Sequence, residues 1–144
     1  MYDNQKRARR KRTLLVDDEP DICMVYQMVL EDAGYECTSY TDPVKALKEF
    51  RPNYYDLILL DIKMPVLNGF ELWKSIRELD KGVQIVFITA AVELYYHQQL
   101  KTQSYPELTN DSIIKHLQKP IGNEELVQIV NTTVATRDTS EVIC

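Results

Sequence analysis

The chain has 144 residues, of which 44% are hydrophobic and 27% charged, and its formal net charge is −5. This composition is typical of a globular domain in water, it excludes disordered and membrane-embedded proteins, and the length suffices for one domain with its own core. The three cysteines and two histidines show no metal-ligand spacing, so we expect structural thiols in a reducing compartment and neither a zinc site nor a disulfide framework.

Basic residues are concentrated near the N-terminus. Six of the seven residues Lys6–Arg12 are basic, whereas residues 13–144 carry 11 basic and 21 acidic side chains. We therefore expect a flexible basic arm at 1–12, a domain at 13–137 and a C-terminal tail at 138–144. The arm is suited to nucleic acid, acidic lipid or an acidic partner, or it is simply a solvated tail. No apolar span long enough for a signal peptide or a membrane helix follows, so we expect a cytoplasmic location without membrane insertion.

The first third of the domain is predicted to alternate strands and helices. A short apolar strand at 13–16 ends at Asp17-Asp18-Glu19-Pro20, which opens a helix, and Gly34 ends that helix. A more polar strand follows at 35–40, and Asp42-Pro43 begins a short helix that ends near residue 50. Five residues are expected on the apolar face of the first helix: Ile22, Val25, Tyr26, Val29 and Leu30.

Two strongly apolar strands are predicted in the middle of the chain, at 57–60 and at 83–88. The first ends at Asp61 and the second at Thr89. A helix lies between them, after a loop that contains Met64-Pro65 and Gly69. Its apolar face is expected to comprise Phe70, Trp73, Ile76 and Leu79.

The last third is predicted to contain a helix, a loop at 104–111, a fifth strand at 113–117 and a final helix. Lys119-Pro120 closes the fifth strand. The residues that define the two helices are Val92, Tyr95, Tyr96 and Leu100 in the first, and Leu126, Ile129, Val130 and Val134 in the second.

The alternation of five strands with five helices predicts an α/β fold. Because the central strands are apolar on both faces, they belong in a parallel sheet that helices cover on both sides. Right-handed crossovers leave few topologies for such a sheet.

Polar side chains follow four of the five predicted strands. They are Asp17 and Asp18, Asp61, Thr89 and Lys119. In open α/β sheets the carboxyl ends of the strands line the functional crevice. Three carboxylates there repel one another unless some are protonated or a cation lies among them, and oxygen ligands without Cys or His favour Mg²⁺. Each residue alone also has a purely structural interpretation, as a helix cap, a turn or a solvated end, but their joint occurrence indicates a site for phosphoryl transfer.

These motifs resemble those of a known family. Leu15-Val16-Asp17-Asp18-Glu19-Pro20, Asp61-Ile62-Lys63-Met64-Pro65 with Gly69, Ile88-Thr89-Ala90 and Lys119-Pro120 occur in the order found in the response-regulator receiver domain of two-component signalling. The resemblance covers residues 13–136. It implies a flavodoxin-like (βα)5 fold, doubly wound, with strand order 2-1-3-4-5 and helices on both faces.

The resemblance also implies a role for each residue of the site. Asp61 would be the phosphoacceptor for a histidine kinase or a histidine phosphotransfer protein, which makes the chain a signalling protein and not a true enzyme. Asp18, Asp61 and the backbone carbonyl of Lys63 would bind Mg²⁺, for which Mn²⁺ could substitute, and Asp17 would act through water. Thr89 and Lys119 would contact the phosphoryl oxygens, and the Lys119-Pro120 bond is a candidate for a cis peptide.

Two features depart from the family pattern. His116 occupies a position that is usually Tyr or Phe, three residues before the lysine, where the aromatic ring switches together with Thr89. A histidine there allows a pH-sensitive switch, or it is a plain surface or half-buried residue. The span between Thr89 and Lys119 is also long, and tyrosines at 95, 96 and 105 populate it. We expect a reshaped output surface formed by the helix after Thr89, the fifth strand and the last helix, or else tyrosines that serve core packing.

The sequence therefore predicts a stand-alone receiver that signals through phosphorylation-dependent contacts with another protein or with a second copy of itself. Two alternatives belong to other classes. A nucleic-acid-associated regulator would use the basic arm. A phosphatase of the haloacid dehalogenase type also uses an Asp after a buried strand, but its motif resembles Asp-x-Asp, whereas Ile62 and Lys63 follow Asp61 here.

Overall fold

The computed structural model of the chain describes residues 9–89 and 115–143. Within these ranges the strands form one parallel sheet of five strands in the order β2-β1-β3-β4-β5. This arrangement confirms the predicted α/β fold and its strand order. The strands are β1 (Arg12–Val16), β2 (Glu36–Tyr40), β3 (Leu57–Asp61), β4 (Gln84–Thr89) and β5 (Lys115–Gln118), and the helices are α2 (Pro20–Asp32), α3 (Pro43–Lys48), α4 (Gly69–Leu79) and α6 (Asn123–Ile143).

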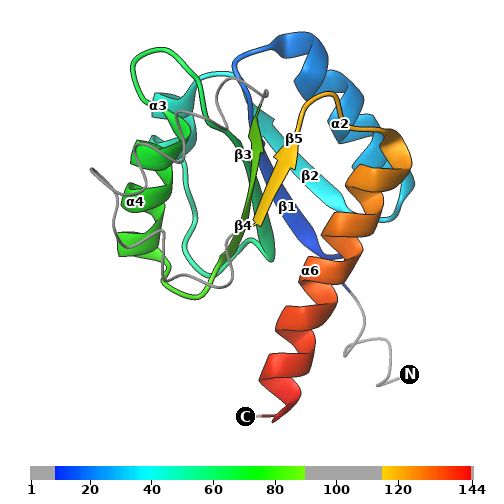
Figure 1. Cartoon of the computed structure of the whole chain (residues 1–144). Helices are drawn as coiled ribbons and strands as arrows, with labels where there is room; N and C mark the ends of the chain where they lie inside the picture. The colour runs from blue at the N-terminus through cyan, green and yellow to red at the C-terminus, as the bar shows by residue number, and fades with distance from the viewer. Residues whose placement is uncertain (1–8, 90–114, 144) are drawn as a thin grey trace.

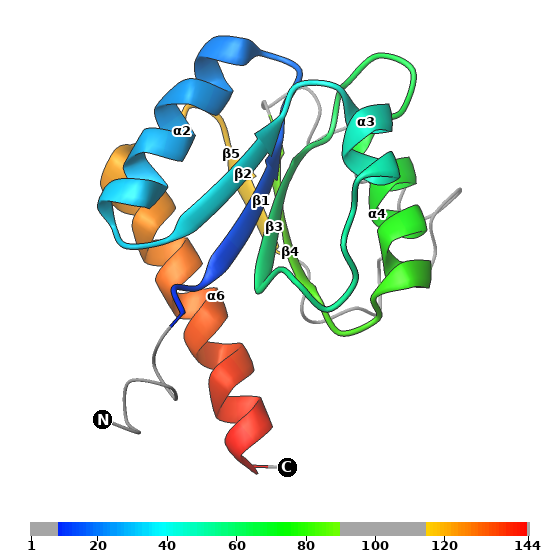
Figure 2. The same ribbon diagram turned by 180° about the vertical axis from the view of Figure 1, so that it is seen from behind.

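Helices cover both faces of the sheet. Figure 1 and the reverse view in Figure 2 show α2 and α6 together on one face and α3 with α4 on the other. Each face has its own hydrophobic core because alternate residues of a strand point to opposite sides. In β1, Leu14 and Val16 join the core under α3 and α4, whereas Leu15 joins the core under α2 and α6. All five residues of β3 are buried, as expected for the middle strand of a doubly covered sheet.

Local sequence signals set several helix boundaries. The Asp42 carboxylate accepts a hydrogen bond of 3.0 Å from the Val44 N–H and thereby caps α3. At the start of α4, Asn68 and Glu71 form a reciprocal capping box, in which each side chain accepts the other residue's backbone N–H at 2.9 Å. Gly34 follows α2 with φ of 98°, a conformation that suits a residue without a Cβ.

Some predicted boundaries differ from the observed ones. The fifth strand is observed at Lys115–Gln118, one residue beyond the predicted end at 117, and residues 113 and 114 lie outside the described ranges. The predicted helix after Thr89 and the loop at 104–111 lie there as well. Residues 138–143, expected to form a tail, instead continue α6 to Ile143, while the domain boundary at 137 stays a prediction.

Two residues predicted to face the core are in fact exposed. Val25 is 44% exposed because the buried stripe of α2 follows Cys23, Tyr26 and Leu30, and Val25 lies beyond its edge. Leu79 is 51% exposed at the last turn of α4.

No helix in the described parts of the chain is both long and apolar enough to cross a bilayer.

The basic arm is shorter than predicted. Arg12 is the first residue of β1, and Arg9 forms an ion pair with Asp56 in which an Arg9 nitrogen lies 2.9 Å from a carboxylate oxygen. Residues 9–12 are therefore part of the folded domain. Asp56 holds them at the entrance to β3, since it also accepts the Arg12 N–H at 2.8 Å.

Candidate functional site at the carboxyl ends of the strands

The parallel sheet brings most of the predicted polar residues to one edge. Asp17 and Asp18 follow β1 directly, Asp61 is the last residue of β3, and Lys119 follows β5. Since parallel strands all end at the same side of the sheet, these residues converge although the helices α2, α3 and α4 lie between them in the sequence. The structure thus shows that the strand ends meet, and it places Lys119 in direct contact with both Asp17 and Asp61.

The Lys119 ammonium lies at the centre of the site. Its Nζ is 2.9 Å from Asp17 Oδ2, 3.4 Å from Asp61 Oδ1 and 3.8 Å from Glu19 Oε1. The Lys119 side chain is 16% exposed, whereas Asp17 is fully buried. The peptide bond between Lys119 and Pro120 is cis, as the motif suggested. One cation therefore bridges two buried carboxylates from different strands.

Burial dominates the electrostatics of Asp61. Removal from water, together with the nearby charge of Asp17, raises the pKa of Asp61 to about 7, although the Lys119 ammonium opposes this shift. For Lys119, burial lowers the pKa, but the hydrogen bond with Asp17 and the charge of Asp61 outweigh burial, and its pKa is raised. The lysine thus stays charged while Asp61 titrates near neutrality.

The acidic residues after β1 can hold a divalent cation. Oxygen atoms of Asp17, Asp18 and Glu19 lie within 4.8 Å of one another. The buried Oδ2 of Asp17 is paired with the Lys119 ammonium at 2.9 Å, and a carboxylate oxygen with one such partner keeps a lone pair for a metal ion. An all-oxygen donor set fits Mg²⁺. Glu19 was not among the predicted ligands, although the run of three acids in the sequence could have indicated it.

Asp61 lies beside this acidic group and shares one hollow with it. The hollow has a volume of about 580 Å³ and is lined by Asp18, Glu19, Asp61, Lys63, Met64, Pro65 and Lys119. The predicted coordination by the Asp61 carboxylate and the Lys63 carbonyl stays a prediction.

The loop after β3 is held tightly against Asp61. The Gly69 N–H donates to the Ile62 carbonyl at 2.8 Å, and a Cβ on Gly69 would lie 2.3 Å from the Asp61 carbonyl oxygen. Only glycine fits at this position. Gly69 thus sets the position of the Asp61 backbone, a role that its place in the motif does not reveal.

The same loop contains a strained residue. Val66 has φ of 71°, which is rare for a β-branched residue, and the Leu67 N–H donates across it to the Pro65 carbonyl at 2.8 Å. Residues 65–67 thus form a γ-turn, and the side chain of Val66 at its centre is 89% exposed. The loop therefore stores backbone strain at the rim of the hollow.

Two predicted switch residues are placed by their backbone alone. Thr89 ends β4 in register with Gln118, and His116 lies in β5 in register with Phe87. Their side chains, and the tyrosines at 95, 96 and 105, lie outside what the structure describes. Their roles stay predictions.

The buried thiols of Cys23 and Cys37 have pKa values raised by burial to about 11, in keeping with structural cysteines.

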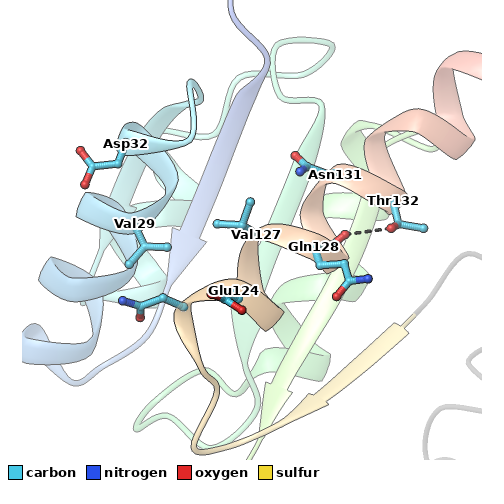
Figure 3. Close-up of a pocket in the computed structure, with 8 residues that line it drawn as sticks. Val29, Asp32, Glu124, Val127, Gln128, Asn131 and Thr132 are labelled. Atoms are coloured by element: carbon cyan, nitrogen blue, oxygen red, sulfur yellow. Dashed lines mark hydrogen bonds between the residues drawn. The ribbon is translucent and has the colours of Figure 1, made fainter.

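A second hollow lies between α2 and α6 (Figure 3). Its volume is about 500 Å³, and Val29 and Val127 provide its apolar part. The other lining residues are amides, carboxylates and a threonine, with no pairing of a nucleophile and a base among them: Asp32, Asn123, Glu124, Gln128, Asn131 and Thr132. This hollow therefore lacks the clustered charges that meet at the strand ends.

Comparison with known proteins agrees with this geometry. A family described as "Response regulator receiver domain" matches residues 13–131. The response regulator receiver protein CpdR of Brucella abortus is 37% identical over 86 residues, which cover 58% of this chain and 72% of CpdR. The response regulator SaeR of Staphylococcus epidermidis is 32% identical over 122 residues, covering 85% of this chain and 49% of SaeR. The chain spans between about a third and a half of the length of the first such relatives.

Solved structures show the same fold. A CheY-like receiver domain protein from Methanospirillum hungatei matches with a TM-score of 0.73 and 22% identity, covering 92% of this chain and 99% of that one. The response regulator protein TrrA from Thermotoga maritima, in complex with Mg(2+)-BeF, matches with a TM-score of 0.66 and 28% identity, covering 85% of this chain and 98% of that one. In that structure a magnesium ion accompanies a receiver fold.

Proposed function

The chain belongs to the response regulator receiver family of two-component signalling, and from this premise we propose that it accepts a phosphoryl group on Asp61 from a histidine kinase or a histidine phosphotransfer protein. One observation carries the proposal. The Asp61 carboxylate is buried at a strand end, beside an acidic group that fits Mg²⁺ and 3.4 Å from a lysine ammonium. A purely structural cap would not require a buried cation between two carboxylates.

In the proposed reaction, an Asp61 oxygen attacks the phosphorus of a phosphohistidine, the new O–P bond forms, and the N–P bond breaks. Asp61 must be ionised to attack, and its pKa of about 7 makes the ionised form available at neutral pH. The Lys119 ammonium would pair with a phosphoryl oxygen, and the Thr89 hydroxyl at the end of β4 would bind another. Asp17, Asp18, Asp61 and the Lys63 carbonyl would hold Mg²⁺, with Mn²⁺ as a substitute. The metal ion supplies neutralisation of the phosphoryl and carboxylate charges.

The consequence of the transfer is a signal and not a released product. Phosphorylation adds charge and acceptor oxygens beside Lys119, which biases a pre-existing equilibrium between surface conformations. We propose that a partner protein, or a second copy of this chain, recognises the changed surface around β5 and α6, with Thr89 and His116 as switch residues. The exposed apolar residues Met24, Val25 and Met28 on α2 offer a further contact for a protein partner on the flank of the site. A cytoplasmic location is part of the same proposal.

The proposal is tested with acetyl phosphate as a small phosphodonor and intact-mass analysis as the readout. With Mg²⁺ present, the wild-type chain should gain the mass of one phosphoryl group, and Mn²⁺ should replace Mg²⁺, whereas chelation should abolish the gain. Asp61→Asn should gain nothing. Asp32→Asn changes an exposed carboxylate at the far end of α2 and is the matched control, so it should be modified like the wild type. If Asp61→Asn still takes up the group, the assignment of the acceptor is wrong.

A further inference from the structure

Basic side chains from two separate parts of the chain meet at the amino ends of the strands, at the end of the sheet opposite Asp61. Arg12 begins β1, and Arg51 lies in the turn between α3 and β3. Both guanidinium groups pack over the ring of Tyr54, at 4.1 Å and 3.7 Å from its centroid. One aromatic ring therefore brings together two like charges from parts of the chain that are 39 positions apart.

Carboxylates do not neutralise this cluster. Asp56 is already engaged by Arg9, through hydrogen bonds of 2.9 and 3.2 Å. Glu36 is the cross-strand neighbour of Arg12 in the sheet, and its charge acts on Arg9. Within residues 9–89 and 115–143, no carboxylate pairs with the side chains of Arg10, Arg12 or Arg51.

One donor of this cluster lacks an acceptor within the described parts of the chain. The Nε of Arg12 is buried and has no hydrogen-bond partner, which is unusual because buried polar groups are nearly always satisfied. Arg10 and Arg51 are exposed residues. The guanidinium group is the side chain that binds phosphate oxygens with two parallel hydrogen bonds.

We propose that Arg10, Arg12 and Arg51 bind the phosphate backbone of a nucleic acid at the end of the sheet opposite the phosphoacceptor. Several guanidinium groups spread from the start of β1 to the loop before β3 match a ligand that repeats its phosphates along a chain. The ring at the centre of the cluster is covered by cations, so the cluster offers no apolar side chain for insertion into a bilayer.

The position of this surface separates it from the signalling chemistry. β1 and β3 each have five residues, which puts about 16 Å between the two ends of the sheet at about 3.3 Å per residue. A bound nucleic acid therefore leaves the hollow around Asp61 open. The receiver could be phosphorylated while it is held on a polyanion.

The test uses the full chain and a fluorescently labelled duplex DNA of arbitrary sequence, with fluorescence anisotropy as the readout at about 50 mM salt and above. We expect binding that weakens steeply with salt. Arg51→Gln should weaken binding several-fold and reduce the slope of log K against log salt by about one. Lys74→Gln removes the same charge from an exposed position on α4 and is the matched control, so it should bind like the wild type.

Arg51→Gln also separates the built surface from the basic run alone, because Arg51 lies far from that run in sequence. Tyr54→Leu should reproduce the loss, since it removes the ring that holds both cations, whereas Tyr54→Phe should retain binding. Asp61→Asn should bind DNA normally. The proposal is overturned if the wild type does not bind at low salt, if Arg51→Gln binds like the wild type, or if the chain binds anionic phosphatidylserine vesicles but not DNA.

Discussion

Replacing Asp61 by Asn should stabilise the fold in the absence of divalent cations. Asp61 is 5% exposed, and burial and Asp17 raise its pKa from the ordinary value of 3.8 to about 7. At about 1.36 kcal/mol per pH unit, this difference sets a ceiling of about 4 kcal/mol on the cost of holding Asp61 ionised in the fold. The carboxylate and Lys119 adjust to each other, so we expect a gain of about 1–3 kcal/mol for the isosteric, uncharged amide.

The pH dependence of this gain has a definite sign. Below about pH 4, Asp61 is protonated in both the folded and the unfolded chain, and its ionisation costs nothing. Between about pH 4 and 7 the unfolded chain releases the proton that the folded chain retains, so the stability of the wild type falls as pH rises through this window. Above about pH 7 the full cost is present. The advantage of Asp61→Asn should therefore grow from acid to neutral pH and then level off.

The assay is urea unfolding in the presence of a chelator, at pH 5 and at pH 8. Trp73 is the single tryptophan and is 3% exposed, so its fluorescence reports the loss of the core. Asp32→Asn, at an exposed position, should change stability by less than about 0.5 kcal/mol. Added Mg²⁺ should stabilise the wild type more than Asp61→Asn. The reasoning is refuted if Asp61→Asn is the less stable protein at pH 8, or if its advantage does not shrink at pH 5.

Two further predictions concern the loop after β3. Gly69→Ala should destabilise the fold by about 2 kcal/mol or more and slow the phosphorylation of Asp61, because the new methyl group would lie 2.3 Å from the Asp61 carbonyl oxygen. Urea unfolding measures the first effect and the intact-mass assay the second. Unchanged values in both would show that the contact relaxes freely. Val66→Gly should stabilise the fold by up to about 1 kcal/mol, because glycine adopts a φ of 71° without strain. Thermal unfolding measures this change, and a loss of stability would contradict a strained γ-turn at Val66.

The sequence alone was sufficient for the fold class and for the candidate phosphoacceptor. Strand period, apolar runs and helix caps are local properties, so β3 and its terminal Asp61 could be read from a few neighbouring residues. Apolarity on both faces of the central strands then required a doubly covered sheet. A parallel sheet in turn required that Asp17, Asp61 and Lys119 end at the same edge.

The tertiary structure decided which groups touch and at what cost. Segments that are distant in sequence meet in the contacts of Lys119 with Asp17 and Asp61, in the closeness of Glu19 to that cation, and in the stacking of Arg12 and Arg51 over Tyr54. The fit of Gly69 against the Asp61 backbone depends on how the loop after β3 folds back on the strand end. Residue order carries no distances, because such contacts arise only when the strands are stacked and the loops are packed on their ends. For the same reason, the raised pKa of Asp61 follows from burial beside a second carboxylate, a property of the assembled sheet and not of the motif.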